Sequence, residues 1–515
     1  MEHDLVLIDR LRDDLRVAGY GVAGVEEALG SIASDALHRE EPVPALRATA
    51  GSGDAVATLV RAFLLGAVVP ASAVVAALPT LGIDGAVALG LVETGGDQVR
   101  ALVDLRPYSA VDGGGEVDWW IASDLGELAT GRPLRTDHVL GVGGASTTLA
   151  QVTVRDPRAL VLDIGTGCGI QALHASRHSR RVIGTDISLR ALEFARFNAL
   201  LAGVVLELRD GSMLEPVADE RFDLVVSNPP FVITPRTPGM PAYEYRDGGR
   251  AGDAIVQELV EGVGAVLAPG GVAQLLGNWE VRRGEQWHER VGGWLDASGL
   301  DGWVVQRELQ DPAQYAETWI RDGGTTPDRD RAAWASRYGS WLDDFASRDV
   351  EAIGFGVLTL RRPLSGAPSL RRLEEVTGTV RQPLGPAIAA SLEAHDWLEF
   401  HDDDGLLASH LVVAPDVTEE RYLTPGESDP QVVLLRQGGG FGRAVQAGTA
   451  LAGFVGACDG DLSVGQIVNA LGALLDVGAD AVAADILPST RGLVRDGLLL
   501  PSAGPGTTHR STTGR

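Results

Sequence analysis

The central part of the chain, residues 155–362, alternates short apolar runs with amphipathic stretches of helical spacing. Each of the first four apolar runs stops at small or acidic residues. The strands of a parallel α/β sheet deliver such loops to one edge, where ligands bind. The pattern therefore predicts a Rossmann-like α/β domain with a binding site at that edge. The four run ends are LDIGTGCGI (162–170), VIGTDIS (182–188), RDGSML (209–214) and FDLVVSNPPF (222–231).

The later part of this domain continues the alternation and completes a predicted sheet of seven strands. DAIVQELVEGVGAVL predicts a long amphipathic helix, VAQLLGNW a fifth strand and WHERVGGWLDASG another helix. WVVQREL and EAIGFGVLTLRR predict the last two strands. An insertion at residues 310–350, rich in Trp, Tyr and Asp, separates them. Because connections of this length are uncommon, we expect the insertion to be functional or partner-facing.

The flanking segments predict smaller modules. Helices followed by a hairpin predict a winged-helix-like module over residues 1–105. The connector at residues 106–154 contains a Gly-rich loop that either closes over a ligand or is a plain connection, and the pattern favours neither. Residues 363–503 form an acidic segment that begins with a linker and a predicted helix at LRRLEEVTG and ends in a second winged-helix-like pattern. The polar residues 504–515 predict a disordered tail.

The charge of the chain is strongly acidic, which bears on its partners. The formal net charge is −27, and none of the 43 basic residues is a lysine. The net charge is negative in each of the ranges 1–110, 111–150, 151–282, 283–362 and 363–515, so loose electrostatic capture of nucleic acid is disfavoured. The helix that would read nucleic acid in the first module carries an aspartate and no arginine. A structural or protein-contacting role is therefore favoured for that module.

Cysteine use and hydropathy exclude several further classes. The two cysteines, Cys168 and Cys458, lie far apart without a CxxC partner, which argues against a disulfide scaffold and the usual zinc sites, so no metal is expected. The N-terminus is acidic and amphipathic, unlike a signal peptide. The apolar stretch at residues 57–92 is interrupted by Arg61 and two prolines, unlike a membrane span. We therefore expect a cytoplasmic protein with no membrane partner.

The first candidate site is the glycine-rich turn after the first strand, formed by Asp163, Gly165, Thr166, Gly167 and Gly169. Glycines let a turn adopt positive φ and approach a ligand closely. The helix that follows presents free backbone N–H groups. Taken alone, the turn fits a nucleotide-type ligand or a tight turn with no ligand.

The second candidate site is the end of the second strand, where Asp186 is followed by Ile187. A carboxylate at this place can accept hydrogen bonds from both ribose hydroxyls of a nucleoside. The same geometry suits NAD, so these two motifs leave the cofactor open.

The third candidate site, Asn228-Pro229-Pro230-Phe231, favours chemistry on a planar NH₂ group. Two prolines fix the backbone and remove two donors, so carbonyl oxygens at the turn face whatever binds there. The Asn228 side chain adds an acceptor, and Phe231 offers a face for stacking. Together these groups can receive both hydrogens of an amide or aromatic amine, which aims the nitrogen lone pair. A plain proline turn after a buried strand is the alternative.

The order of these motifs resembles the class I S-adenosylmethionine-dependent methyltransferases, and NPPF is similar to the motif of enzymes that methylate planar nitrogens. The chain most resembles the release-factor glutamine N5-methyltransferases, with small-domain RNA guanine and adenine N6-methyltransferases as cousins, over less than half its length. The resemblance implies that the glycine turn holds the amino-acid end of S-adenosylmethionine, with Asp163 near the ammonium group. It implies that Asp210 meets the adenine amino group, that Gly211 and Ser212 line that pocket, and that Asn228 borders both cofactor and acceptor.

The acceptor is predicted from the motif set and the charge. Phe231 departs from the tyrosine usual in the release-factor enzymes, and the flanking modules and the insertion are foreign to that family. The acidic segments favour a glutamine side chain of a protein, such as a translation factor. The nearest alternative is a guanine N2 or adenine N6 amino group of rRNA or tRNA. A non-catalytic scaffold that retains the fold is the third interpretation, against which the intact Asn228 motif argues.

Overall fold

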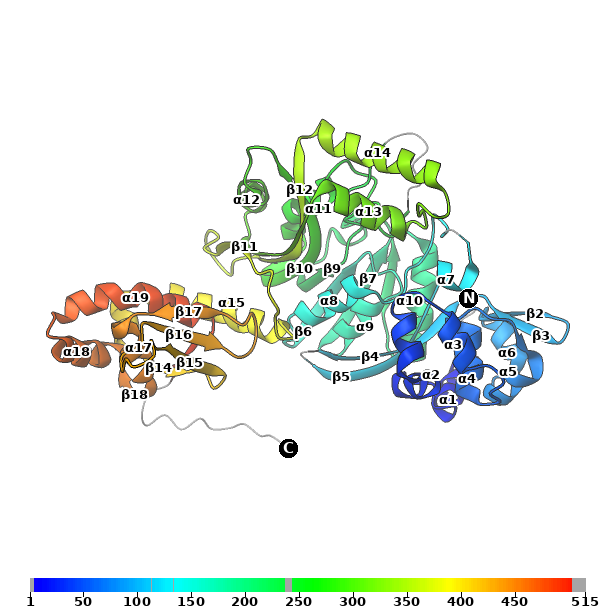
Figure 1. The fold of residues 1–515 in the computed structure, drawn as a ribbon, viewed down its shortest axis with the longest axis horizontal. Helices are drawn as coiled ribbons and strands as arrows, with labels where there is room; N and C mark the ends of the chain where they lie inside the picture. The colour runs from blue at the N-terminus through cyan, green and yellow to red at the C-terminus, as the bar shows by residue number, and fades with distance from the viewer. Residues whose placement is uncertain (1–3, 113, 133, 237–242, 503–515) are drawn as a thin grey trace. The chain divides into compact units, whose positions relative to one another are not determined.

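The computed structural model describes residues 4–112, 114–132, 134–236 and 243–502 (Figure 1). The chain divides into two compact units, Met1–Thr377 and Gly378–Arg515. The first unit contains the predicted α/β domain together with the segments before it. The predicted tail at residues 504–515 lies outside the described residues.

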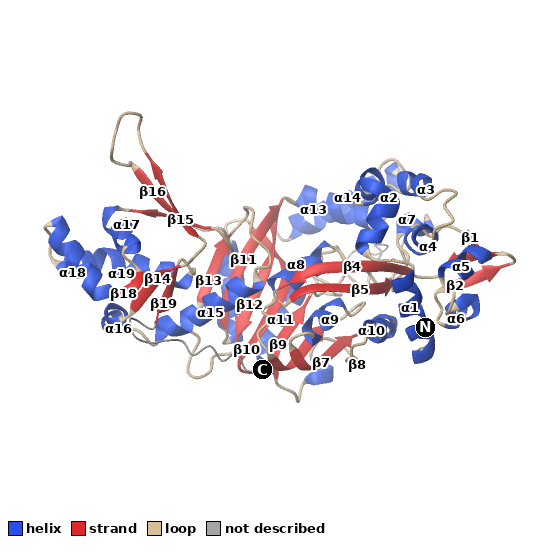
Figure 2. Cartoon of the chain, turned by 90° about the horizontal axis from the view of Figure 1, so that it is seen from below, coloured by secondary structure: helices blue, strands red, loops and turns tan. Residues whose placement is uncertain are grey.

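An eight-stranded sheet of order β13-β11-β12-β10-β9-β6-β7-β8 forms the centre of the first unit and confirms the predicted α/β class (Figure 2). Strands β8, β7, β6, β9 and β10 are parallel, and β12 runs antiparallel to its neighbours β10 and β11. The chain order reverses between β6 and β9, where open α/β sheets bind ligands. The strands are β6 (Arg158–Ile164), β7 (Ser179–Asp186), β8 (Glu207–Asp210), β9 (Phe222–Ser227), β10 (Leu267–Arg282), β11 (Asp301–Gln310), β12 (Val350–Arg361) and β13 (Arg371–Glu375).

The eighth strand corrects two sequence predictions. The predicted helix at LRRLEEVTG is wrong, because Arg371–Glu375 form β13, and the sheet has eight strands instead of seven. β13 pairs in parallel with β11, whose backbone groups would otherwise be unpaired on that edge. Glu374 accepts a hydrogen bond of 2.8 Å from the indole nitrogen of Trp303 on β11. Pairing with a distant strand therefore outweighs the local helical pattern.

Helices after the strands cover the sheet as the alternation predicts. α9 and α10 pack on β7, and α11 and α12 pack on β10. Ser188 caps α10 by accepting a hydrogen bond from the Ala191 N–H, and Gly203 ends the helix in the left-handed region. These helices are α9 (Ile170–Ser176), α10 (Leu189–Ala202), α11 (Ala254–Gly262) and α12 (Trp287–Ser298), with the 3₁₀ turns η2 (Glu215–Val217) and η3 (Val263–Ala265).

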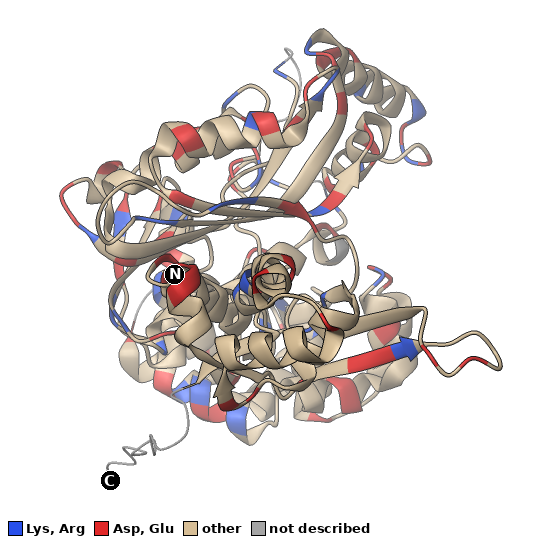
Figure 3. Cartoon of the chain, turned by 90° about the vertical axis from the view of Figure 1, so that its left-hand side faces the viewer, with Lys and Arg blue, Asp and Glu red and all other residues tan. Residues whose placement is uncertain are grey.

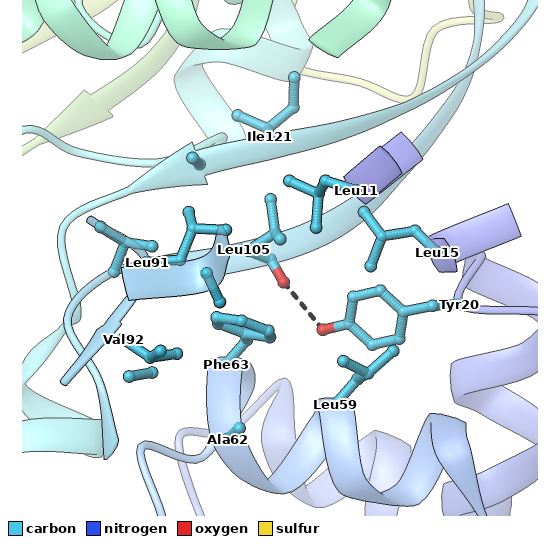
Figure 4. Close-up of a cluster of buried hydrophobic side chains, with 14 of the residues drawn as sticks. Leu11, Leu15, Tyr20, Leu59, Ala62, Phe63, Leu91, Val92, Leu105 and Ile121 are labelled. Atoms are coloured by element: carbon cyan, nitrogen blue, oxygen red, sulfur yellow. Dashed lines mark hydrogen bonds between the residues drawn. The ribbon is translucent and has the colours of Figure 1, made fainter. Parts of the chain in front are cut away.

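The N-terminal segment shares one hydrophobic core with the sheet domain. Tyr20 is fully buried, and its hydroxyl donates a hydrogen bond of 2.8 Å to the carbonyl of Leu105 (Figure 4). The same core cluster contains Phe63 and the α10 residues Phe194 and Phe197. The winged-helix assignment of this segment stays a prediction. Its elements are α1 (Leu5–Val17), α2 (Val22–Leu37), α3 (Val43–Ala48), α4 (Ala55–Leu59), η1 (Val60–Leu64), β1 (Val69–Pro70), α5 (Ala71–Ala77), α6 (Gly82–Ala88), β2 (Val92–Gly95) and β3 (Gln98–Ala101).

The connector is a two-stranded ribbon followed by helices, and Asn198 of α10 ties it to the domain. The Asn198 side chain is fully buried. It accepts from the Ala122 N–H at 2.8 Å and donates to the carbonyls of Ala122 at 2.9 Å and Cys168 at 2.8 Å. One side chain thus joins the ribbon to the glycine turn. The connector comprises β4 (Asp104–Asp112), β5 (Gly115–Ser123), α7 (Glu127–Thr130) and α8 (Gly144–Val152).

The insertion between β11 and β12 folds as two helices, α13 (Pro312–Asp322) and α14 (Arg331–Ser347). Asp311 and Asp330 cap them by accepting backbone hydrogen bonds in the first turn. The two helices pack on each other and on β12. The insertion therefore belongs to the first unit and does not form a separate unit.

The second unit has its own core and mixes helices with two three-stranded sheets, β18-β14-β19 and β15-β16-β17. The predicted helix at GPAIAASLEAHDWLE and strand at VVLLRQGG are confirmed as α15 and β16. A winged-helix assignment stays a prediction here too. The elements are α15 (Gly385–Glu399), α16 (Asp403–Ala408), β14 (His410–Val413), β15 (Val417–Tyr422), β16 (Val432–Gln437), β17 (Ala444–Ala447), α17 (Thr449–Gly456), β18 (Asp459–Ser463), α18 (Val464–Leu475), α19 (Ala479–Arg495) and β19 (Leu499–Ser502).

No single described helix is long and apolar enough to cross a membrane. The bent pair α5 and α6 together has sufficient length and apolar composition. No group of three or more His, Cys, Asp or Glu side chains within the described ranges is placed to hold a metal ion.

Candidate functional site

A cavity of about 410 Å³ opens at the carboxyl ends of β6, β7 and β9. It brings together most of the residues that the sequence singles out. Gly169, Asp210 and Phe231 do not contribute to its described lining. The predicted residues on the lining are Asp163, Gly165, Thr166, Gly167, Asp186, Ile187, Gly211, Ser212, Asn228, Pro229 and Pro230.

The glycine turn takes the backbone form that glycine favours. Gly165, Gly167 and Gly169 have φ of +67°, +54° and +88°. A Cβ added at Gly165 or Gly167 would meet no atom within 4 Å, so these residues leave open space beside the cavity. At Gly169 a Cβ would lie 3.1 Å from Ala195 of α10. Gly169 therefore serves the packing of α9 against α10, which explains its absence from the lining.

Asp163 shapes the turn from inside. Its carboxylate is buried and accepts hydrogen bonds from the Thr166 hydroxyl at 2.7 Å and the Ala172 N–H at 3.0 Å. Burial raises the pKa of Asp163 to about 7, the hydrogen bonds from Thr166 and Ala172 oppose that rise, and nearby Asp186 adds to it. One of its oxygens is thus committed to holding the turn and the start of α9.

Asp186 lies at the end of β7 and closes the same turn from the other side. One carboxylate oxygen accepts from the Gly167 N–H and the other from the Ser188 N–H, each at 2.9 Å. Burial raises its pKa. Each oxygen retains a lone pair for a further donor. Asp210, the last residue of β8, is exposed and lies beside the lining instead of on it.

Asn228 follows β9 and presents an unused acceptor. Its side-chain oxygen is buried and has no hydrogen-bond partner among the described residues, and the same holds for the hydroxyl of Thr185 on β7. Both residues line the cavity. Ser227, just before Asn228, donates a hydrogen bond of 2.9 Å to the Ile164 carbonyl and so fixes the strand end to β6. A buried polar atom without a partner calls for an explanation such as a ligand group.

The proline turn is tighter than the sequence suggests. The carbonyl of Pro229 accepts a hydrogen bond of 2.7 Å from the Phe231 N–H, so part of its acceptor capacity is used within the turn. Phe231 is 7% exposed, and its ring lies 5.5 Å from the ring of Phe355 on β12. The structure therefore places Phe231 in packing behind the turn.

The connector supplies residues that the main sequence prediction leaves out. His138, Gly141 and Ser146 line the cavity. The chain there is held because Asp124 accepts a hydrogen bond of 2.9 Å from the Val139 N–H. The Gly-rich loop signalled this contribution, but nothing in the pattern distinguished a cavity wall from a plain connection.

The segment after the proline turn supplies the opposite wall. Glu244, Tyr245, Asp247, Arg250 and Glu258 reach the lining. Asp247 pairs with Arg236, and Glu258 pairs with Arg250 at 3.0 Å. Glu244 is exposed and contributes to the raised pKa of Asp186. Among the charged groups of the lining, carboxyl groups therefore predominate, with Asp163 and Asp186 adding two more.

Comparison with known proteins agrees with this geometry. Residues 141–292 match the family described as "Methyltransferase small domain", and residues 17–102 and 389–501 match two domains of unknown function. The chain is 38% identical over 122 residues to a release factor glutamine methyltransferase of Geobacter sulfurreducens, spanning 22% of this chain and 43% of that relative. A ribosomal protein uL3 glutamine methyltransferase of Bradyrhizobium diazoefficiens is 29% identical over 34% of this chain and 59% of the relative.

The solved structures found include a T. Thermophilus 16S rRNA N2 G1207 methyltransferase, 17% identical, with a TM-score of 0.27 over 54% of this chain and 60% of that one. The chain spans only about half the length of the curated relatives it matches. The motifs at 162–170, 182–188, 209–214 and 222–231 all fall within the matched residues 141–292. Residues 141–292 of this chain are therefore similar to the methyltransferase small domain, and the chain is similar in sequence to the release factor glutamine methyltransferases.

Proposed function

We propose that this chain transfers a methyl group from S-adenosylmethionine to a planar nitrogen, and that the acceptor is a glutamine side chain of a protein. The observation that carries the proposal is the side-chain oxygen of Asn228, which is buried at the wall of the cavity and has no hydrogen-bond partner among the residues that the structure describes. A hydrogen-bond donor from a bound acceptor would satisfy it, and an amide NH₂ is such a donor.

The cavity fits the proposed cofactor on three features of this chain. Gly165 and Gly167 leave open space beside the lining. The Asp186 carboxylate retains acceptor capacity for ribose hydroxyls. The Thr185 hydroxyl is buried without a partner on the same wall. When bound, S-adenosylmethionine supplies an electrophilic methyl group. Asp163 would act by holding the turn, because its buried carboxylate already bonds Thr166 and Ala172.

The residues after β9 would activate the acceptor by orientation. The lone pair of an amide nitrogen is delocalised, so the nitrogen is a weak nucleophile. The Asn228 side-chain oxygen and the Pro229 carbonyl oxygen would accept hydrogen bonds from the two N–H groups of the acceptor. These bonds would aim the nitrogen lone pair at the methyl group. Acceptors fixed in advance also stabilise the positive charge that develops on the nitrogen. The proton leaves after transfer, so no strong base need act first.

The charge of the lining supports a protein acceptor over RNA. Five carboxyl groups and one arginine contribute to the lining, and that arginine, Arg250, is paired with Glu258. Figure 3 shows acidic positions spread over helices, strands and loops of the chain. Binding of the RNA phosphate backbone needs positive charge on the protein to release counterions, and the cavity lining offers little positive charge. A glutamine side chain of a protein is uncharged and needs no positive charge at the site.

A labelling experiment tests the proposal. The protein is incubated with tritiated S-adenosylmethionine and cell extract, with ribonuclease or protease added to parallel samples, and Asn228→Ala serves as the inactive control. Label that survives ribonuclease and disappears with protease supports the protein acceptor. Label lost with ribonuclease would instead establish an RNA base as the acceptor. No label above the Asn228→Ala control would favour the scaffold interpretation.

A further inference from the structure

We infer that the α13–α14 insertion is an internal clamp, and that Tyr315 on α13 is a positioning residue for the acceptor side of the cavity. The inference rests on the proposed function. The clamped parts are residues 231–234 and 243–247, here called the acceptor segments. The first segment follows Asn228-Pro229-Pro230 directly in the chain, and the second, further along, reaches the cavity lining.

Tyr315 makes the first contact. Its hydroxyl oxygen accepts hydrogen bonds from the Ile233 N–H at 3.1 Å and from the side-chain nitrogen of Asn278 on β10 at 2.8 Å. All three residues are at most 2% exposed. Water therefore does not replace the hydroxyl easily, and without it a buried backbone N–H would have no partner. Tyr315 thus joins the first acceptor segment to the central sheet.

The C-terminal end of α13 makes the second contact, through Arg246. The Arg246 guanidinium donates a hydrogen bond of 2.9 Å to the carbonyl of Trp319 and pairs with Asp322. It lies 4.5 Å from the centre of the Tyr243 ring. Asp322 also accepts a hydrogen bond of 3.0 Å from the hydroxyl of Tyr245, which lines the cavity. The second acceptor segment is therefore held by the same helix.

The two segments are also joined to each other. The Val232 N–H donates to the Arg246 carbonyl at 3.0 Å, and Phe231 forms an antiparallel bridge with Asp247. Pro229 and Pro230 leave little backbone freedom between this pair and Asn228. A shift at Ile233 is therefore transmitted to Asn228, where small misplacement is costly for a reaction that depends on orientation.

The base of the clamp is rigid. The Tyr315 ring packs against Trp341 and Phe345 of α14, with ring centres 6.0 and 5.9 Å away. Trp341 and Phe345 are each 1% exposed. The buried face of the insertion thus holds the acceptor segments. The length of the insertion alone did not reveal this role.

The test is Tyr315→Phe, which removes the hydroxyl and keeps the ring. Tyr338→Phe is the matched control, because in the described structure its hydroxyl donates a hydrogen bond of 3.3 Å within the insertion itself, to the Ala313 carbonyl. Hydrogen exchange of residues 231–234 and single-turnover methyl transfer are measured on the full chain. For Tyr315→Phe we expect the hydrogen-exchange rate at Ile233 to rise and the methyl-transfer rate to fall, each by about tenfold or more. The affinity for S-adenosylmethionine should stay within about twofold of wild type. Tyr338→Phe should match wild type in all three.

The outcomes separate the clamp from the proposed function. Unchanged exchange at Ile233, or faster exchange with unchanged transfer, would overturn the positioning role. If wild type binds S-adenosylmethionine but methylates nothing, the proposed function fails, and exchange alone decides whether the clamp exists. Asp322→Asn gives a second reading if Tyr315→Phe does not fold, because exchange across residues 243–247 should then rise. A normal exchange pattern in that variant would count against the clamp.

Discussion

The two walls of the cavity are built in different ways. On the cofactor side, Asp163 accepts hydrogen bonds from the Thr166 hydroxyl and the Ala172 N–H, and Asp186 accepts from the Gly167 and Ser188 N–H groups, so their partners are close in sequence or follow the adjoining strand. On the acceptor side, the Asn228 oxygen has no partner in the described part of the chain. The chain after it is held by Tyr315, which is itself bonded to Asn278, and both are far away in sequence. The contacts that hold the first wall are local, whereas the second wall is held by elements distant in sequence.

This difference separates what the two walls can do. A wall whose carboxylates already hold the backbone is rigid before any ligand arrives, which suits a cofactor used for every turnover. A wall with a buried unpaired acceptor is destabilised until a donor reaches it, which suits recognition of one chemical group in the acceptor. Mutations on the two walls should therefore change different measured quantities, cofactor affinity on one side and transfer rate on the other.

The largest expected effect is that of Asn228→Ala. Methyl transfer should fall by about 10²-fold or more, because a preorganised polar group is lost from the transition state. Cofactor affinity by calorimetry and the melting temperature should stay near wild type, since the removed oxygen has no partner within the described protein. A variant that kept full transfer activity would show that the proline motif is only a turn.

The matching change on the cofactor side is Asp186→Ala. Cofactor binding should weaken by about 1–3 kcal/mol if the carboxylate accepts ribose hydroxyls. The turn should also loosen, because the Gly167 and Ser188 N–H groups lose their acceptor. Calorimetry with S-adenosylmethionine and with NAD checks the cofactor class in the same series. Tight NAD binding by wild type, with no response to S-adenosylmethionine, would end the methyltransferase proposal.

Asp163 gives a pH-dependent prediction. Its folded-state pKa is raised to about 7, above the ordinary value for an aspartate, so the folded state holds a proton that the unfolded state releases. Its contribution to stability is therefore present at pH below about 4 and is lost as pH rises towards 7. Asp163→Asn, which cannot ionise, should gain stability relative to wild type over that window, by up to about 1.4 kcal/mol per pH unit. Urea unfolding at several pH values measures the difference, and parallel curves for both proteins would refute the assignment.

The comparison of the two walls also explains how far the sequence could go. The meeting of Asp163, Gly165, Gly167 and Asp186 at one cavity was predictable because these residues stand next to the strand ends that carry them. Gly169 was assigned to the cofactor although its packing against Ala195 depends on α10, which local spacing does not reveal.

The acceptor wall was less predictable because its contacts are long-range. The hydrogen bond between Tyr315 and Ile233 spans 82 positions, and no periodicity marks such a pair. The eighth strand was missed for the same reason, since β13 owes its form to pairing with β11. In the connector, the Gly-rich loop was visible, but its place on the cavity depends on the bond between Asp124 and Val139.

The smallest expected effect is that of Phe231→Leu. It decides whether Phe231 packs on Phe355 or stacks on the acceptor. If Phe231 serves mainly to pack on Phe355, loss of the ring pair should cost about 0.5–1.5 kcal/mol of unfolding free energy, and the KM for the acceptor should stay unchanged. If the ring instead moves to stack on the acceptor, the KM should rise while stability changes little. Phe355→Leu is the matched control, because it removes the other half of the ring pair without touching the motif. Equal stability losses in the two variants, with equal acceptor KM, would place Phe231 among the residues that support Asn228 from behind, since a stacking platform would give the two variants different KM values.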